Sequence, residues 1–593
     1  MANLPAGRDL ASVPGERLGP ISQGFLLALI ICALSLPGLW QMPTLDRDEA
    51  RFAQATKQML ETGDALRIRF QGKERNKKPH GIHWLQAISV RVLSADHPTN
   101  IWAYRVPSVL GLALAVFGVW ALGGHLADRE TGWRAALLFG AGPVAMAEAT
   151  IAKTDAMLTG LVVIMMLALA KCVIPRAPPI HRRHGDLFWV LTFWLALTAA
   201  ILIKGPIAPM IAALTVIGLV GWRRIIGAGE KALPPRALQP TLKKTLKPGL
   251  GFALMIVLLG PWAMATHRAT QGRFFTDALG WDFLGKVAQV QELHGGPPGY
   301  HLALLPLLFW PVAGVLPWLI HRVITARESP GFWQPSPPIL FLGAWLIPAW
   351  IVFEGTSTKL PHYTLPLYPA LALLAAIALR IAPGAASPRW VRGLGIMLLA
   401  GIGVGVGAAL IFLPLRFSDA SPGPTAYGAA LLIVALSGLA AHAKWRHQLI
   451  RMAGITAFTS WLACTMLLTT TLPGLDRLAL SQKLAQALGG YPAEAIFLLG
   501  YEEPSAVFLL GTQISFAPDA VTLITDLGPT DPAIAIVAFP EAPAVERAAK
   551  DAGLHLTRVA NIDGFNYSIG TPTNLVIYRR DGDIAMPRLP TRN

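Results

Sequence analysis

The sequence predicts a polytopic α-helical membrane protein that ends in a small α/β domain. Hydrophobic residues make up 53% of the 593 residues, and the mean hydropathy is +0.49. Charged residues make up only 14%, whereas an ordinary soluble domain carries about a quarter. This composition excludes a soluble globular enzyme and a disordered chain. The 18 Trp and 48 Pro are typical of membrane interfaces and membrane helices.

The predicted membrane domain covers residues 1–472. A bilayer-spanning helix needs about 20 mostly apolar residues. Thirteen runs meet this requirement, although several are short or contain Gly and Pro, so about thirteen transmembrane helices are expected. The first run is too long for a cleaved signal peptide. The runs lie near 22–41, 103–123, 134–152, 156–173, 187–203, 206–222, 249–266, 300–320, 338–353, 364–380, 393–414, 425–441 and 453–472.

The basic residues predict the orientation of these helices, because cytoplasmic loops carry an excess of Lys and Arg. With a cytoplasmic N-terminus, most basic loop residues fall on the cytoplasmic side. The short loops on the other side hold little more than Lys153, Lys204, Lys359 and Arg416. Membrane topology therefore explains the net charge of +16 better than nucleic-acid binding does, and it places the C-terminal tail outside the cytoplasm.

Two of the outer loops are long, near 42–102 and 267–299. Long loops in a compact protein are usually functional or disordered. Helical periodicity at Ala50–Thr62 and His83–Leu93 predicts that the first loop is ordered, with amphipathic helices on the outer membrane surface.

The tail, residues 473–593, is predicted to form the α/β domain. Its short apolar runs are typical of strands and alternate with helical segments. No disulfide framework is expected, because all three cysteines lie inside apolar runs of the chain. The predicted strands are Ala495–Leu499, Val521–Ile524, Ala533–Phe539 and Leu575–Tyr578, and the predicted helices are Leu478–Ala487 and Ala542–Ala552.

Acidic residues mark the start of the first outer loop and one tight hairpin. Asp48 and Glu49 follow a membrane helix closely, with Arg51 beside them, and Asp155 lies between two apolar runs. Charged residues at the membrane indicate function by default. Acids also complement the dipole at the start of a helix, and Thr154 or Asp155 could cap one. On these residues alone, capping and catalysis both stay open.

Basic residues recur on the same face. Lys78 lies in the dense basic stretch 72–79, and Lys204 and Lys359 each stand between two apolar runs. A single lysine at a membrane edge usually just extends to the headgroups. Several lysines on a face poor in other charge favour an anion site, and a lipid-linked phosphate fits, since Lys binds phosphate as a point charge.

Short motifs follow one another in order on alternate outer loops, and the set is more specific than any single motif. They are Asp48-Glu49-Ala50-Arg51-Phe52-Ala53, Thr62-Gly63-Asp64, Lys78-Pro79, Trp84-Leu85, Thr154-Asp155, Lys204-Gly205-Pro206, Gly260-Pro261-Trp262 and Lys359-Leu360-Pro361-His362-Tyr363. The set resembles the bacterial aminoarabinose transferases, which are related to the protein O-mannosyltransferases. Both belong to the GT-C membrane glycosyltransferases. The resemblance spans about residues 20–380 and continues more weakly into the tail at 500–505.

The resemblance implies a GT-C fold with thirteen membrane helices and a periplasmic C-terminal domain. It also implies an enzyme of the bacterial inner membrane that moves a sugar from a polyprenyl phosphate to an acceptor at the periplasmic face. Within the family, acceptors include lipid A, lipopolysaccharide cores, polysaccharides and proteins.

Individual residues take their implied roles from the same resemblance. Asp48 matches the catalytic acid, with Glu49 beside it as a further candidate, and Asp155 matches the second acidic position. A carboxylate at Asp48 could deprotonate the acceptor as general base or stabilise an oxocarbenium-like transition state. The resemblance implies that cations also stabilise the leaving phosphate. The expected contacts of the carrier lipid are Lys78, Lys204, Lys286, Lys359, Tyr363 and Arg51.

Two positions depart from the zinc site of the aminoarabinose transferases. Lys77 stands where those enzymes have a zinc-binding glutamate, and Phe283 stands where they have a histidine. We therefore expect the zinc site of that family to be lost, which leaves the donor sugar and the acceptor open. Another divalent metal could bind to a different set of residues, but their spacing matches no recognised metal site, and ordinary loop residues are the simpler interpretation. The set is Glu74, His80, His83, Asp282 and His294.

The sequence thus predicts an inverting glycosyltransferase that takes its donor from the membrane. Two alternatives belong to other classes: a transporter or flippase of a glycolipid, and a non-enzymatic envelope scaffold. Transporters place charges near the bilayer midplane and often show two related halves, and the sequence has neither feature.

Overall fold

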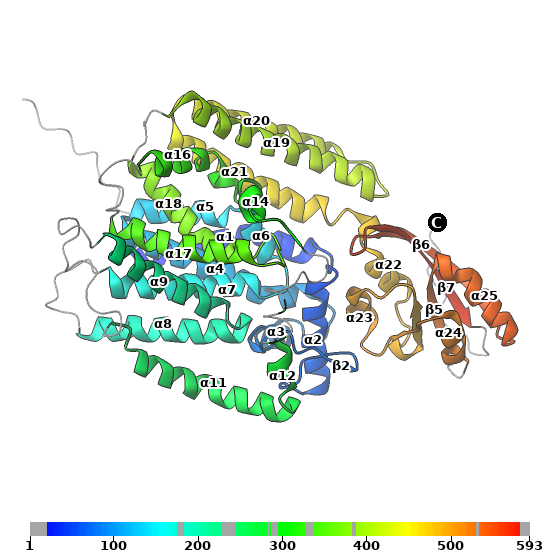
Figure 1. Cartoon of the computed structure of the whole chain (residues 1–593). Coiled ribbons are helices and arrows are strands. Elements are labelled where there is room, and N and C mark those ends of the chain that lie inside the picture. The colour runs from blue at the N-terminus through cyan, green and yellow to red at the C-terminus, as the bar shows by residue number, and fades with distance from the viewer. Residues whose placement is uncertain are drawn as a thin grey trace, which may run out of the picture.

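A bundle of long helices makes up most of the chain, and a small sheet domain projects from one end of it (Figure 1). We call this the tail-side end of the bundle. The structure is a computed structural model, and it describes residues 20–174, 183–226, 245–278, 280, 285, 295–326, 336–381, 387–528 and 533–580.

Eight of the described helices are long and apolar enough to cross a membrane, which confirms the predicted fold class. The count of thirteen spans stays a prediction. The helical elements are α1 (Pro20–Gln41), α4 (Ile101–Leu126), α5 (Arg129–Gly140), α6 (Pro143–Ala149), α7 (Asp155–Val173), α8 (Arg183–Lys204), α9 (Ile207–Ile226), α11 (Pro248–Thr270), α12 (Arg273–Phe275), α14 (Tyr300–Leu308), α15 (Trp310–Ala313), α16 (Leu316–Ala326), α17 (Pro337–Gly355), η3 (Leu365–Leu367), α18 (Tyr368–Ile381), α19 (Arg389–Phe417), α20 (Pro424–Trp445), α21 (Leu449–Met466) and η4 (Leu467–Thr471).

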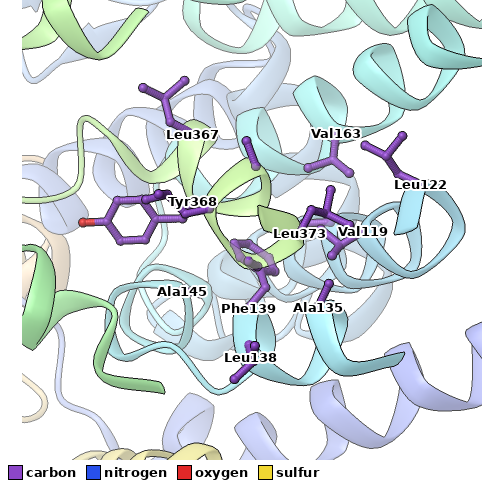
Figure 2. Packing of buried hydrophobic residues seen from close by; sticks show 14 of the residues in the cluster. Val119, Leu122, Ala135, Leu138, Phe139, Ala145, Val163, Leu367, Tyr368 and Leu373 are labelled. Atoms are coloured by element: carbon purple, nitrogen blue, oxygen red, sulfur yellow. The ribbon is translucent and has the colours of Figure 1, made fainter. Parts of the chain in front are cut away.

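Helix α7 lies at the centre of the bundle and packs closely on α4. Figure 2 shows Val163 of α7 among side chains from other helices, including Val119 of α4 and Leu373 of α18. Glycines allow the close approach of α4 and α7, because a Cβ at Gly111 would lie 2.4 Å from the Met157 nitrogen. Small residues serve the same purpose in other membrane bundles.

The first long loop folds into two helices and a short hairpin at the tail-side end. Helices α2 (Asp48–Thr62) and α3 (Gly81–Leu93) confirm the two predicted helical segments. Between them, β1 (Arg69–Phe70) pairs antiparallel with β2 (Lys73–Glu74). Apolar side chains of α2 and α3 pack on the bundle, among them Phe52 and Ile82. Much of the second predicted loop, 267–299, lies outside the described residues.

A five-stranded mixed sheet in the order β4-β3-β5-β7-β6 forms the centre of the C-terminal domain. Strand β3 pairs parallel with β4 and β5, whereas β7 pairs antiparallel with β5 and β6. Apolar clusters cover both faces of the sheet. The elements are α22 (Leu480–Ala487), β3 (Ile496–Leu499), α23 (Pro504–Leu510), β4 (Ser515–Phe516), α24 (Ala520–Leu527), β5 (Ile534–Ala538), α25 (Ala542–Asp551), β6 (Leu556–Asn566) and β7 (Thr571–Arg580).

One strand prediction in this domain is wrong. Val521–Ile524, expected as a strand, lies within helix α24. The Asp519 side chain caps this helix by accepting a hydrogen bond from the Thr522 nitrogen at 2.8 Å. A short apolar run has no periodicity that separates a buried strand from one turn of a buried helix.

Candidate active site

A cavity of about 1060 Å³ opens at the tail-side end of the bundle. Residues from several of the predicted motifs line it, including Asp48 and Lys78 from the first loop and Asp155 from the start of α7. The C-terminal domain also contributes to its wall, through Tyr567, Ser568 and Ile569 of the β6–β7 turn. The cavity therefore joins segments that are far apart in the sequence.

Asp48 is the first residue of α2 and is half-buried in the cavity wall. Burial acts to raise the pKa of Asp48, but the positive charges of Lys153 and Arg75 outweigh it, so the pKa lies below the ordinary value. The carboxylate is therefore ionised at neutral pH. An ionised carboxylate beside several cations is a negative charge held in place inside a mainly positive cavity.

Glu49 is not among the residues that line the cavity. Its side chain is 1% exposed and receives two hydrogen bonds from the Arg105 guanidinium, each 2.8 Å long. The same carboxylate accepts hydrogen bonds from the backbone nitrogens of Leu45 and Ala152. These contacts tie the first loop, α4 and the 150–154 hairpin together, which gives Glu49 a structural position rather than one facing a substrate.

Asp155 is held by Lys204 on the cavity wall. The Lys204 ammonium donates to Asp155 Oδ1 at 2.5 Å, and it also lies 5.4 Å from the centre of the Tyr363 ring. Behind this pair, Lys153 lies 3.1 Å from Glu148 of α6. Asp155 begins α7, Lys204 ends α8 and Glu148 belongs to α6, so three helices meet at this cluster.

His362 completes this cluster. Its ring lies 3.6 Å from Glu148 and 3.9 Å from Asp155. Burial lowers the pKa of His362 to about 3, and Lys153 acts in the same direction, while Asp155 opposes the shift. The imidazole is therefore neutral at physiological pH and can donate or accept one hydrogen bond without adding charge.

The cavity has an excess of positive charge, with six basic side chains against three carboxylates. The basic residues include two of the predicted phosphate contacts, Lys78 and Lys204, together with Lys77, the neighbour of Lys78. The predicted contact Tyr363 also lines the cavity. An excess of cations in a partly enclosed site favours an anion. The other basic residues of the wall are Arg47, Arg75 and Lys153.

Two predicted contacts are placed elsewhere. Lys359 is 5% exposed and donates to the Thr356 carbonyl at 2.5 Å, and neither it nor Arg51 is among the lining residues. Arg51 still lies near enough to lower the pKa of Asp48. Lys286 lies outside the described residues.

Much of the remaining wall is apolar and aromatic. Side chains from α7, α8 and the second long loop supply it, including Leu158, Ile201 and Phe274. A cavity that offers cations on one part of its wall and hydrocarbon on another matches an amphipathic ligand with an anionic head. The further apolar residues are Phe52, Ile207, Trp262, Phe275, Ala278, Phe353 and Leu360.

The described residues of the alternative metal set, Glu74, His80 and His83, have separate partners. His83 is buried and bonds to Thr56 Oγ1 at 2.8 Å, whereas His80 contacts the Leu66 carbonyl and Trp262. Glu74 pairs with Arg273, and Asp282, Phe283 and His294 lie outside the described residues. Within the described part of the chain, no group of three or more His, Cys, Asp or Glu side chains is arranged to hold a metal ion.

Several members of the site are not among the predicted site residues, including Glu148 and Arg75. Glu148 had a detectable signal, because it is an acid inside the apolar run 134–152, and ionisable residues in such runs indicate function. Arg75 lies in the basic stretch of the first loop and stacks over the Phe52 ring at 5.2 Å. Only the folded loop distinguishes it from the neighbouring basic residues.

The chain is similar to known proteins in both sequence and fold. Residues 77–231 match the family described as dolichyl-phosphate-mannose-protein mannosyltransferase. The chain is 28% identical over 442 residues to the undecaprenyl phosphate-alpha-4-amino-4-deoxy-L-arabinose arabinosyl transferase of Pseudomonas paraeruginosa, and the match covers 73% of this chain and 72% of that protein. A transferase of the same name from Shewanella sediminis is 25% identical over 353 residues, or 59% of this chain and 58% of that protein.

The fold also matches a solved structure. The crystal structure of ArnT from Cupriavidus metallidurans bound to undecaprenyl phosphate superposes with a TM-score of 0.70 and 19% identity, over 95% of this chain and 99% of ArnT. The apo form of the same protein gives a TM-score of 0.68. The structural likeness confirms the predicted fold class, and the family and sequence matches confirm the predicted resemblance to the GT-C membrane glycosyltransferases.

Proposed function

We propose that this GT-C glycosyltransferase moves a sugar from undecaprenyl phosphate, or a similar polyprenyl phosphate, to a lipid A-type acceptor. One observation carries the proposal: a single cavity combines an ionised aspartate, an excess of lysine and arginine, and an apolar wall. The named transferases that this chain resembles use an undecaprenyl phosphate sugar as donor. We place the enzyme in the bacterial inner membrane, with the cavity and the C-terminal domain on the periplasmic side.

The donor binds with its prenyl chain along the apolar wall and its phosphate among the basic residues. Lys78 and Lys204 are the cations that meet the phosphate, and Arg75 and Lys77 stand beside them on the wall. Because the phosphate is also the leaving group, these cations stabilise the negative charge that develops as the bond to the sugar breaks.

Asp48 faces the anomeric carbon of the sugar. The acceptor oxygen forms a bond to this carbon while the bond from the carbon to the phosphate oxygen breaks, and the configuration inverts. The electron pair of the broken bond leaves with the phosphate, and the proton of a hydroxyl acceptor passes to the released phosphate or to water. A lowered pKa makes Asp48 a poor proton acceptor, since an effective base has a pKa near the working pH. Its retained negative charge suits the second role better, which is stabilisation of the positive charge on the sugar ring in the transition state.

Asp155 and His362 support the cations. Asp155 holds the Lys204 ammonium at 2.5 Å, and Lys153 is fixed between Glu148 and His362. These pairs keep two long and otherwise flexible side chains in one position, which lowers the entropy lost when the phosphate binds.

We further propose that transfer requires no zinc. Lys77 lines the cavity, and a charged ammonium cannot bind a divalent cation. The basic wall supplies the charge stabilisation that a metal would otherwise provide.

The experiment is mass spectrometry of envelope glycolipids from a deletion strain that carries either the wild-type chain or Asp48→Asn. We expect lipid A-type molecules that are heavier by one sugar with the wild-type chain only. If neither strain contains the heavier lipid and both proteins are well expressed, the lipid A-type acceptor is wrong. Glycoproteins and polysaccharides compared in the same way would then show whether another acceptor replaces it.

A further inference from the structure

The two residues before Asp48 are bound by the C-terminal domain. The backbone nitrogen of Asp46 donates a hydrogen bond to the Tyr567 hydroxyl at 2.5 Å. The Asp46 carboxylate accepts one from the Ser505 backbone nitrogen at 3.0 Å. Tyr567 belongs to the β6–β7 turn and Ser505 to α23, so two separate parts of the domain hold the same residue.

Arg47 has an unusual backbone conformation between these contacts and α2. Its φ is 66° and its ψ is −105°, a combination that residues other than glycine rarely adopt. Such a conformation persists only where surrounding contacts determine it, and it often occurs at functional sites. Here the Arg47 guanidinium donates to the Ser568 carbonyl at 3.2 Å and lies 3.9 Å from Glu503.

Glu503 fixes the turn that receives Arg47. It is 5% exposed, and it accepts hydrogen bonds from the Asn566 side chain at 2.9 Å and the Ser568 hydroxyl at 3.0 Å. A buried carboxylate is unfavourable unless it is paired and hydrogen-bonded. The contacts on both sides of Glu503 therefore join the β6–β7 turn to the residue that precedes Asp48.

We propose that the C-terminal domain positions Asp48: Glu503, Ser505 and the 566–568 turn hold residues 46 and 47 in the conformation from which α2 and its first side chain start. Glu503 is accordingly a positioning residue that acts through Arg47. This inference rests on the proposed function for the role of Asp48, although the mechanical link itself does not depend on it.

A second contact between the same domains provides the control. In the middle of α2, Gln54 donates to the Thr512 hydroxyl at 2.8 Å, and this hydroxyl donates to Glu61 at the far end of the helix at 2.7 Å. Thr512→Val removes both hydrogen bonds with little change in shape. It weakens the attachment of the C-terminal domain without touching residues 46–48.

The test compares steady-state kinetics of the full-length chain in lipid vesicles, with undecaprenyl phosphate-aminoarabinose as donor and lipid A as acceptor. We expect Glu503→Ala to lower kcat by about tenfold or more with KM for both substrates nearly unchanged, because misplacement affects the transition state most. Glu503→Gln keeps the side-chain shape and one of the two acceptor oxygens but loses the charge that faces Arg47, so kcat should fall less than in Glu503→Ala. Thr512→Val should stay within about twofold of the wild type. Tyr567→Phe removes the hydroxyl that accepts a hydrogen bond from the Asp46 nitrogen. It should lower kcat less than Glu503→Ala does, and it tests the same link if Glu503→Ala fails to fold.

Hydrogen exchange gives a measurement that needs no substrate. Amides of the 45–51 segment should exchange faster in Glu503→Ala and Tyr567→Phe than in the wild type or Thr512→Val, since the Ala50 and Arg51 nitrogens bond to the Leu45 and Arg47 carbonyls. Unchanged exchange would overturn the inference, and so would a change in KM alone or equal losses in Glu503→Ala and Thr512→Val. If the wild type shows no transfer but the exchange result holds, the positioning stands and the proposed donor and acceptor are wrong.

Discussion

The membrane domain and the C-terminal domain place their charges differently. At the tail-side end of the bundle, Glu49, Glu148 and Asp155 are at most 4% exposed, and each lies within ion-pair distance of a basic side chain. In the C-terminal domain, charged residues such as Asp551 and Asp563 are exposed to solvent. Buried charge is unfavourable, so its concentration at one end of the bundle indicates where the chemistry takes place.

Glu503 departs from the pattern of its own domain. It is buried like the charges of the bundle, and it lies beside Arg47 at the edge of the cavity. Buried charge thus occurs both at the proposed reactive end of the membrane domain and in the part of the C-terminal domain that contacts it.

The largest expected effect comes from Asp48→Asn. We expect transfer to fall by about 100-fold or more, because removal of one group that stabilises charge in the transition state costs on this scale. The amount of protein in the membrane should not change. The matched control is Asp563→Asn, an exposed carboxylate of the C-terminal domain, which should transfer normally. Equal activity of both variants in a radiolabelled transfer assay would contradict the assignment.

Glu49→Gln should affect stability instead of chemistry. It leaves the Arg105 guanidinium buried without its charged partner, and breaking such a pair costs about 3–5 kcal/mol. Thermal unfolding of the detergent-solubilised protein should show a markedly lower Tm. Folded Glu49→Gln protein should retain the wild-type kcat. A normal Tm combined with lost turnover would instead make Glu49 catalytic and remove the contrast with Asp48.

Lys78→Ala should weaken donor binding. Loss of one charge-assisted contact to phosphate corresponds to about a tenfold increase in KM for the donor, with a smaller effect on the acceptor. Lys73→Ala is the control, because Lys73 lies in the same loop, is exposed and is not among the residues that line the cavity. If both variants bind the polyprenyl phosphate equally well, the phosphate lies elsewhere in the cavity.

The contact between the domains should depend on pH. Burial raises the pKa of Asp46 from 3.8 to about 7, and Glu503 adds to the shift, while the hydrogen bond from Ser505 opposes it. The folded chain therefore keeps a proton that the unfolded chain has lost, which stabilises the folded chain most at low pH. This stabilisation is lost as the pH rises from about 4 to about 7. Asp46→Asn should flatten the change of Tm across this range, and an unchanged profile would count against a raised pKa.

A chelator should produce the smallest effect. We expect EDTA to leave transfer by the purified protein unchanged, since the described part of the chain has no cluster of metal ligands. Inhibition that a divalent ion reverses would show that the second long loop supplies a metal site.

The contrast between Asp48 and Glu49 also shows what the sequence can predict. The motif order identified Asp48, Asp155, Lys78 and Lys204 as neighbours, and the structure places all four on one cavity wall. The motif could not separate Asp48 from Glu49, because consecutive residues of a helix point about 100° apart and only the folded loop decides which one faces the cavity.

Contacts between residues that are far apart in the chain could not be predicted from the sequence for a similar reason. The positive φ of Arg47 depends on Ser568 and Glu503, which are hundreds of residues away in the chain. Lys359 occupies a motif position, yet its ammonium bonds to its own loop at Thr356. Spacing along the chain predicts which segments meet, but the direction of each side chain follows from packing.

The central claim is that the cavity transfers a sugar from a polyprenyl phosphate. The most direct measurement is mass spectrometry of the products formed by the purified full-length chain in vesicles that contain undecaprenyl phosphate-aminoarabinose and lipid A. We predict that the wild type converts lipid A to a species heavier by one sugar and releases undecaprenyl phosphate, and that Asp48→Asn does neither. A wild-type protein that carries the intact donor lipid across the vesicle membrane without cleaving it would contradict the account and identify a flippase.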